Sequence, residues 1–461
     1  MCMQHVKPPL ARRSRISVGS GSSIITAVGI AAGVAIISPS SALPFFWYLG
    51  LCVISYWIFF GRVRPEVIWL YCAYSIGVIV LYLIQNYELP AYIGFSGGRG
   101  VGTDDCKFWI AASEGVHREL PAHCYNLRPH PFTYFLRFTT PFPLAKPLDL
   151  LFVCAWGMAL LPPALRRLTF SVTGERRAAW ASFWFMATCL YTAANGLVLI
   201  RDAWVALSLV ASLLFFYERR YVLLSLAVGF GFFLRPASGL LIVASVCILA
   251  AVREMFARRD QAKRLSNMTL VSVAGLAIAV AVLYAVIQVS GAKLGGGGLL
   301  SIFYREDFLE GYLARQEESI LVAILRQPLH IRIPLSYVFF LGGPYFQVEA
   351  VVQETAFFVP RLLMYGGLFP FIYIWAFAFM ARGAFVSFSR KQWMMVVLFI
   401  VLSFLTISIS QASMQYRHKV LLLPLIYLFA GYGFSIRGRS GRWAAVLAGL
   451  GLAAIQLYSV L

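Results

Sequence analysis

The sequence predicts an all-α protein, a polytopic transmembrane helical bundle, and three observations favour this fold class. Hydrophobic residues make up 60% of the 461 positions and charged residues only 13%, whereas charged groups supply about 25% of a typical globular chain. The mean hydropathy is +0.77. Apolar runs of roughly 15 to 22 residues recur from end to end, which is the length that spans a hydrocarbon core about 30 Å thick.

Helix is the secondary structure expected for each run, because every backbone polar group inside a bilayer must be satisfied within the protein. We expect about 11 to 13 transmembrane spans from this pattern. In chain order, the candidate spans are 22–38, 43–60, 66–86, 148–165, 179–199, 203–216, 221–234, 237–252, 268–290, 362–381, 392–410, 420–434 and 443–460.

Basic or turn-forming residues separate consecutive spans and justify their limits. "SPSSA" follows the first span, which resembles a signal peptide because "KPPLARRSR" precedes it. The next separators, in order, are "GRVR", the long loop 87–147, "RRLTFSVTGERR", "RD", "ERR", "RP", "REMFARRDQAKR", the long loop 291–361, "ARGAFVSFSRKQ", "QYRHK" and "RGRSGR".

The domain organisation follows from the lack of linkers between spans. No Pro- or Ser-rich segment interrupts the apolar runs, so residues 1–461 are expected to form one membrane-embedded domain. We expect loop 87–147 to be external and region 291–361 to be external or re-entrant.

Basic residues orient the chain. Threading the spans from a cytoplasmic N-terminus places 23 Lys/Arg and 5 Asp/Glu on one side, a net charge of +18, and leaves a net +2 on the other side. Cytoplasmic loops of membrane proteins carry such an excess of Lys and Arg. The chain's net charge of +20 therefore needs no nucleic acid to explain it.

Three short turns on the far side carry charged residues. Spans 203–216 and 221–234 are short for crossing a bilayer, so their outer ends would lie below the outer surface. Charged groups at that depth are costly and usually mark a partner or a pathway. The residues concerned are Arg201 and Asp202, then Arg235, and then Arg417, His418 and Lys419.

Arginine binds phosphate through two parallel hydrogen bonds, so these turns suit an anionic ligand with a lipid tail, such as a polyprenyl-linked sugar. The alternative is that each arginine is a helix end reaching for lipid headgroups.

Two adjacent carboxylates stand in the first long loop, in "GGRGVGTDDCKFW". Asp104 and Asp105 fall on the side whose net charge is only +2. Neighbouring like charges raise the proton affinity of one member of such a pair. One aspartate could therefore act as a general base, although pairing with Lys107 or Arg118 is the structural alternative.

A carboxylate pair in the first large external loop, followed by short helices and the turns "LIRDAW", "FLRPASG" and "QYRHKVLLLP", resembles the GT-C class of integral-membrane glycosyltransferases. The resemblance extends to polytopic proteins of exopolysaccharide and O-antigen assembly. It covers much of the chain as a pattern, and its motifs are short. The family's single aspartate or spaced acidic pair is here the adjacent "TDD", so either carboxylate can correspond to the catalytic one.

The resemblance implies a bacterial inner-membrane enzyme that transfers a sugar or oligosaccharide from a polyprenyl-phosphate donor to a glycan or lipid-linked acceptor on the periplasmic or external face. Asp105 or Asp104 would be the base, whereas Arg201, Arg235, Arg417 and Lys419 would bind the leaving phosphate. His418 would donate a hydrogen bond to that phosphate or to a sugar, and Asp202 would orient Arg201 or Arg235. Polysaccharide-assembly proteins would be partners, and both single transfer and repeat-unit polymerisation remain open.

Cofactor use and two other readings also remain open. Some related transferases use a divalent cation such as Mg or Mn and others use none, so Asp104 and Asp105 could hold one. His117, His123, Cys124 and His130 crowd the same loop, but their spacings match no familiar zinc pattern. A transporter or flippase for an anionic or lipid-linked substrate is the alternative from another class, because arginines and aspartates at short helices also occur in anion carriers.

Overall fold

The computed structural model describes an all-helical protein. No strand occurs among the described residues, which confirms the predicted all-α class in its coarse form. Five helices in the described part are long and apolar enough to cross a membrane: Pro39–Phe60, Leu148–Thr173, Pro236–Arg253, Phe369–Ser389 and Trp393–Ser410. The described residues are 21–88, 108–109, 112, 131–144, 147–196, 201–257, 323–324, 326–343, 368–412, 416–437 and 439–458.

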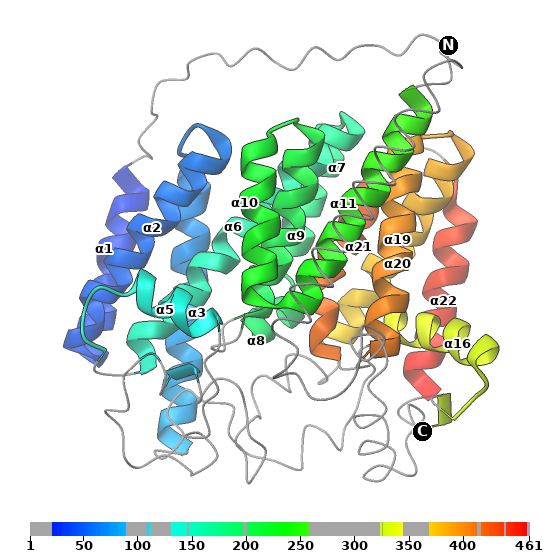
Figure 1. The fold of residues 1–461 in the computed structure, drawn as a ribbon. Helices are drawn as coiled ribbons and strands as arrows, with labels where there is room; N and C mark the ends of the chain where they lie inside the picture. The colour runs from blue at the N-terminus through cyan, green and yellow to red at the C-terminus, as the bar shows by residue number, and fades with distance from the viewer. Residues whose placement is uncertain are drawn as a thin grey trace, which may run out of the picture.

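The longer helices run between two ends, which we name the upper and lower ends as drawn in Figure 1. The elements are α1 (Gly21–Ile37), the 3-10 helix η1 (Pro39–Ser41), α2 (Ala42–Phe60), α3 (Pro65–Glu88), α5 (Pro131–Thr139), α6 (Pro147–Thr173), α7 (Arg176–Ala187), α8 (Leu190–Gly196), α9 (Asp202–Tyr217), α10 (Tyr221–Leu234), α11 (Pro236–Ala257), α16 (Leu329–Gly342), α19 (Leu368–Ser389), α20 (Trp393–Ala412), the 3-10 helix η5 (Tyr416–Leu421), α21 (Leu423–Ser435) and α22 (Arg442–Tyr458).

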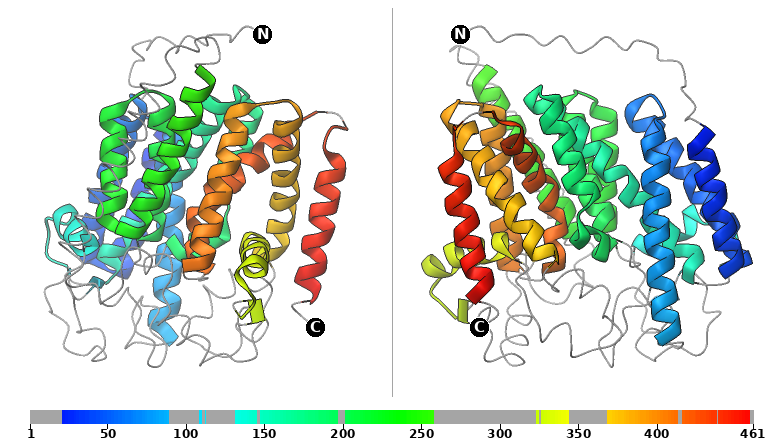
Figure 2. Two further views of the ribbon diagram at one scale, coloured as in Figure 1. Left: turned by 45° about the vertical axis from the view of Figure 1, so that its right-hand side comes forward. Right: turned by 180° about the vertical axis from the view of Figure 1, so that it is seen from behind.

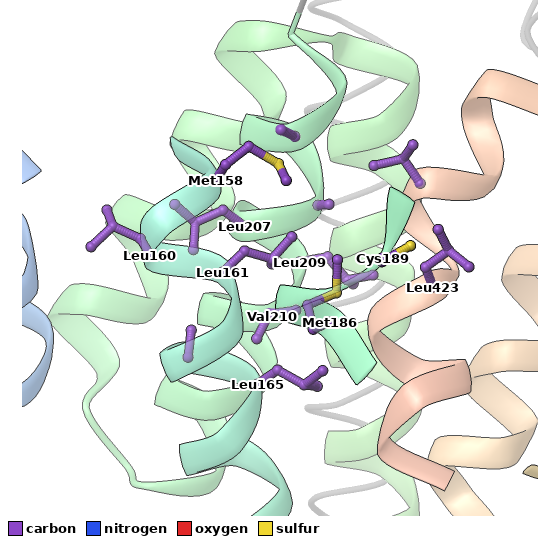
Figure 3. Close-up of a cluster of buried hydrophobic side chains, with 14 of the residues drawn as sticks. Met158, Leu160, Leu161, Leu165, Met186, Cys189, Leu207, Leu209, Val210 and Leu423 are labelled. Atoms are coloured by element: carbon purple, nitrogen blue, oxygen red, sulfur yellow. The ribbon is translucent and has the colours of Figure 1, made fainter. Parts of the chain in front are cut away.

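The core of the bundle forms around α6. This helix packs against α2, α3, α7 and α9, and its most apolar window is entirely buried inside the protein. Figure 3 shows Leu161 and Leu165 of α6 on the side of Leu209 and Val210 of α9 and Met186 of α7. Helices α9 and α21 are also buried along almost their whole length. Together with α6 they form the hydrophobic core. At the lower end, the 3-10 helix η5 packs against α9 and α21 of this core.

Helices α19 and α21 approach each other through glycine. A Cβ atom at Gly383 of α19 would collide with the Phe429 carbonyl oxygen, and one at Gly433 of α21 would collide with the Phe379 carbonyl oxygen. Only glycine permits this backbone separation, and small residues bring membrane helices together in the same way. The crossing fixes the upper ends of α19 and α21 relative to each other.

Several predicted limits differ from the observed ones. Span 362–381 was expected to end before Arg382, whereas α19 continues to Ser389. Arg382 fits inside the helix because its Nε donates a hydrogen bond to the Ser440 carbonyl oxygen, 3.0 Å away. Span 179–199 is broken into α7 and α8 at Thr188 and Cys189, and candidate span 268–290 lies outside the described residues.

Helical segments also occur within the predicted external loop and within the region predicted to be external or re-entrant. Within loop 87–147 the structure places α5, and within region 291–361 it places α16, whose residues include the apolar stretch Tyr337–Leu341. Both helices lie at the lower end (Figure 1). The short spans 203–216 and 221–234 match α9 and α10 closely, and neither helix reaches the length of the five candidate spans.

Ion pairs join helices at the upper end. Arg166 of α6 makes two hydrogen bonds of 2.6 and 2.5 Å to the Glu66 carboxylate of α3, and its guanidinium lies 4.5 Å from the Trp180 ring centroid. Arg167 similarly binds Glu218 with N–O distances of 2.5 and 2.7 Å. Glu66 and Glu218 therefore hold α3, α6 and the α9–α10 turn together.

Candidate functional site

Arg235 lies at the centre of a polar cluster at the lower end. Its Nη1 donates to Asp202 Oδ1 at 3.3 Å, and its Nη2 lies 2.6 Å from His418 Nε2. These three residues come from the α10–α11 junction, the start of α9 and the helix η5. The structure therefore brings together side chains from the three charged turns that the sequence singled out.

Local sequence explains why Arg235 stands at this end. Pro236 begins α11, and a residue that precedes proline is disfavoured in the helical conformation. Arg235 accordingly adopts an extended conformation with φ −156° and ψ 100° and ends α10. The break separates two apolar helices and leaves the guanidinium between their ends.

Asp202 owes its position to the start of α9. It occupies the first turn of this helix, where the partial positive charge of the helix N-terminus stabilises a carboxylate. The residue is 8% exposed, and the Arg235 side chain is 23% exposed. Because water is largely excluded from the pair, its electrostatic interaction is stronger than that of a surface ion pair.

Arg201 precedes Asp202 and contacts a different group. Its guanidinium carbon lies 5.9 Å from the centroid of the Phe108 ring, within the range of a cation–π interaction. Phe108 is buried and packs edge-on against Phe132 of α5, with 5.0 Å between ring centroids. The start of α9 is thereby linked to the loop that separates α3 from α6.

Lys419 has a different environment from the one that a phosphate-binding role predicts. Its Nζ is fully buried and donates hydrogen bonds to the carbonyl oxygens of Leu341, at 2.7 Å, and Gly343. The same atom lies 4.0 Å from the centroid of the Tyr373 ring. Burial lowers the pKa of Lys419 well below its usual value. Lys419 thus connects η5 to the C-terminal end of α16.

Replacing Lys419 with Met is expected to destabilise the protein by about 2 kcal/mol, because two buried carbonyl oxygens lose their donor. The measurement is the thermal unfolding midpoint in detergent. Lys391→Met is the matched control, since Lys391 is exposed and surface substitutions change stability by about 0.5 kcal/mol or less. Equal midpoints for both variants and the wild type would exclude this structural role.

The remaining predicted site residues are only partly placed. Arg417 lies in η5, which sets its backbone at the lower end. Asp104 and Asp105 lie outside the described residues, as do His117, His123, Cys124 and His130. In the described ranges, no group of three or more His, Cys, Asp or Glu residues could hold a metal ion.

Sequence reasoning missed one buried acid at the lower end. Asp149 lies in the first turn of α6 at 1% exposure, and its Oδ1 accepts a hydrogen bond from Ser41 Oγ. Ser41 Oγ also lies 2.8 Å from Ser38 Oγ, within hydrogen-bonding distance, so the carboxylate joins a small hydroxyl network that fixes η1 against α6. The signal was an aspartate inside the apolar stretch "PLDLLFV", where an unneeded charge would be costly.

The fold and the lower-end cluster define an all-α protein whose apolar helices are of the kind that spans membranes, with a partly buried Arg–Asp–His group at one end. Comparison with models of protein families, with curated proteins and with solved structures finds no significant match to this chain.

Proposed function

We propose that the protein is a membrane glycosyltransferase of the GT-C type that uses a polyprenyl-phosphate-linked sugar or oligosaccharide donor in the assembly of a cell-surface polysaccharide. Its reaction centre would lie at the lower end, which the predicted orientation of the chain places on the periplasmic or external face. Support comes from the local geometry of Arg235 and from the sequence pattern around it.

The observation that carries the proposal is the Arg235 guanidinium held between Asp202 and His418. Both Nη atoms of the guanidinium are held, Nη1 by Asp202 and Nη2 by His418. These contacts therefore fix the orientation of the planar Arg235 guanidinium before a ligand binds. A phosphate that approached the half-buried face of Arg235 would meet an oriented cation with His418 beside it, which suits a leaving phosphate.

The proposed transfer has three coupled changes. An acceptor hydroxyl oxygen forms a bond to the anomeric carbon of the donor sugar, and the bond from that carbon to the phosphate oxygen breaks. The phosphate leaves with the bonding electron pair, and Arg235, with Arg201 and His418 nearby, stabilises its charge. The hydroxyl proton passes to a carboxylate, for which we assign Asp105 ahead of Asp104.

Chain connectivity is compatible with the proposed role of Asp105 beside the cation cluster. Phe108, whose ring lies under the Arg201 guanidinium, follows Asp105 by three residues. Three residues span at most about 11 Å between Cα atoms. The interaction of Phe108 with Arg201 is therefore compatible with the proposed role of Asp105.

The proposal is tested with purified protein in proteoliposomes and radiolabelled polyprenyl-linked sugars extracted from membranes of the source organism. We expect label to move from the lipid extract into a glycan, with release of polyprenyl phosphate. A ladder of repeat units would identify polymerisation, and one added unit would identify single transfer. Movement of intact label across the bilayer with no new glycosidic bond would contradict the proposal and favour a transporter.

A further inference from the structure

Five exposed basic residues gather at the upper end of the C-terminal helices. Arg390 and Lys391 form the α19–α20 turn, Arg437 and Arg439 follow α21, and Arg442 begins α22. We name these residues the C-terminal basic patch. They belong to two turns that lie on neighbouring helices, because α19 packs against α20, α21 and α22, as the left view of Figure 2 shows.

The fold holds the two turns in a fixed relation. Buried Arg382 of α19 donates from Nε to the Ser440 carbonyl oxygen at 3.0 Å. Next to it, Gly441 has a φ of +68° and packs closely on Val386 of α19, and this left-handed conformation suits glycine. Contacts between helices therefore fix the position of the patch on the surface.

The C-terminal segment contributes only basic and neutral residues to this end of the protein. Residues 355–461 contain neither aspartate nor glutamate. At the upper end, Glu66 and Glu218 bind Arg166 and Arg167, and Glu175 accepts a hydrogen bond of 2.7 Å from Ser435 Oγ. This distribution differs from that of the N-terminal half, where basic turns and acids pair across helices.

Apolar and aromatic side chains surround the patch on its outer side. Trp393 at the start of α20 is 46% exposed and Trp443 at the start of α22 is 79% exposed. Below Trp443, Leu447 and Leu450 of α22 are 69% and 65% exposed, so they extend the apolar surface along the helix. Tryptophan is enriched at the level of lipid headgroups, and exposed leucines suit acyl chains.

We propose that the C-terminal basic patch is a binding site for the headgroup of an anionic phospholipid, whose acyl chains lie along the exposed face of α22. Basic residues at a membrane surface attract anionic lipids, and arginine forms paired hydrogen bonds with phosphate. The site is separate from the lower-end cluster and does not depend on glycosyl transfer. It would retain anionic lipids around α19–α22 in preference to zwitterionic ones.

Native mass spectrometry of the full-length protein in detergent tests this site, with phosphatidylglycerol and phosphatidylcholine of identical acyl chains as probes. We expect the wild type to bind phosphatidylglycerol about tenfold more tightly than phosphatidylcholine. The combined variant Arg437→Gln, Arg439→Gln and Arg442→Gln should lose at least about tenfold of the phosphatidylglycerol affinity, because each basic residue contributes a several-fold factor.

A control variant removes the same formal charge elsewhere at the upper end. Arg62→Gln, Arg64→Gln and Arg219→Gln change residues of the α2–α3 and α9–α10 turns, of which Arg62 and Arg219 are exposed, and phosphatidylglycerol affinity should stay within about twofold. Replacement of the three patch arginines with Lys should retain most binding, and Arg439→Gln alone gives a graded loss if the triple variant fails to fold. Equal losses in the two triple Gln variants, or wild-type affinity in the Gln variants of the patch, would overturn the proposal.

Discussion

Alanine at Arg235 is expected to lower the rate of sugar transfer by about 100-fold or more while the protein remains in the membrane. Loss of one oriented donor to a developing negative charge has a cost of this size in other enzymes. Arg235 is the side chain that both Asp202 and His418 contact, so its removal leaves the cluster without its central cation. The measurement is the initial rate of transfer from a polyprenyl-linked donor in proteoliposomes.

Two further variants separate charge from geometry at this position. Arg235→Lys keeps the charge but cannot reproduce the planar fork, so it should restore little of the rate. Asp202→Asn should have a smaller effect, about tenfold, because it loosens the orientation of Arg235 without removing its charge. Arg219→Ala at the upper end, where Arg219 is exposed, should leave the rate unchanged. Full activity of Arg235→Ala would show that Arg235 has no role in transfer and is only a helix-terminal residue.

Asparagine at the catalytic member of the Asp104–Asp105 pair is expected to lower transfer by roughly 100-fold or more, the scale for loss of a positioned proton acceptor. Asparagine at the other member should have a milder effect. We expect the larger loss at Asp105. Binding of the lipid-linked donor should survive both changes, because the proposed phosphate contacts belong to Arg235 and its neighbours.

Rate and binding must be measured on the same preparations. Transfer assays give the rate, and equilibrium retention of radiolabelled donor gives the affinity. Glu175→Gln is a matched acid control, because Glu175 lies at the upper end, where it accepts a hydrogen bond from Ser435. A double variant of Asp104 and Asp105 that transfers sugar at the wild-type rate, at a normal expression level, would remove the proposed base from the mechanism.

The helices were predictable because hydropathy is a local property of the sequence. Limits of α9 and α10 follow within about one residue from the charged and proline-containing stretches "RD", "ERR" and "RP". The extension of α19 past Arg382 was not predictable, because a charged residue normally marks the end of an apolar run. In the folded protein a carbonyl oxygen of the α21–α22 turn accepts a hydrogen bond from that arginine.

The sequence by itself determined which residues of the candidate site stand at helix ends. Pro236 stops α10 at Arg235, and Asp202 opens α9. These positions follow from backbone chemistry that acts over a few residues, so they can be read without knowledge of the fold.

Only the tertiary structure decided which of these ends meet. His418 and Lys419 are consecutive in η5, yet His418 contacts Arg235 whereas Lys419 is buried against α16 carbonyl oxygens and Tyr373. Nothing in "YRHKV" distinguishes the two residues, because the direction of each side chain depends on how η5 packs between α9 and α16. Charge and hydropathy act along the chain, whereas the partner of a buried charge is set by packing between segments that are far apart in sequence.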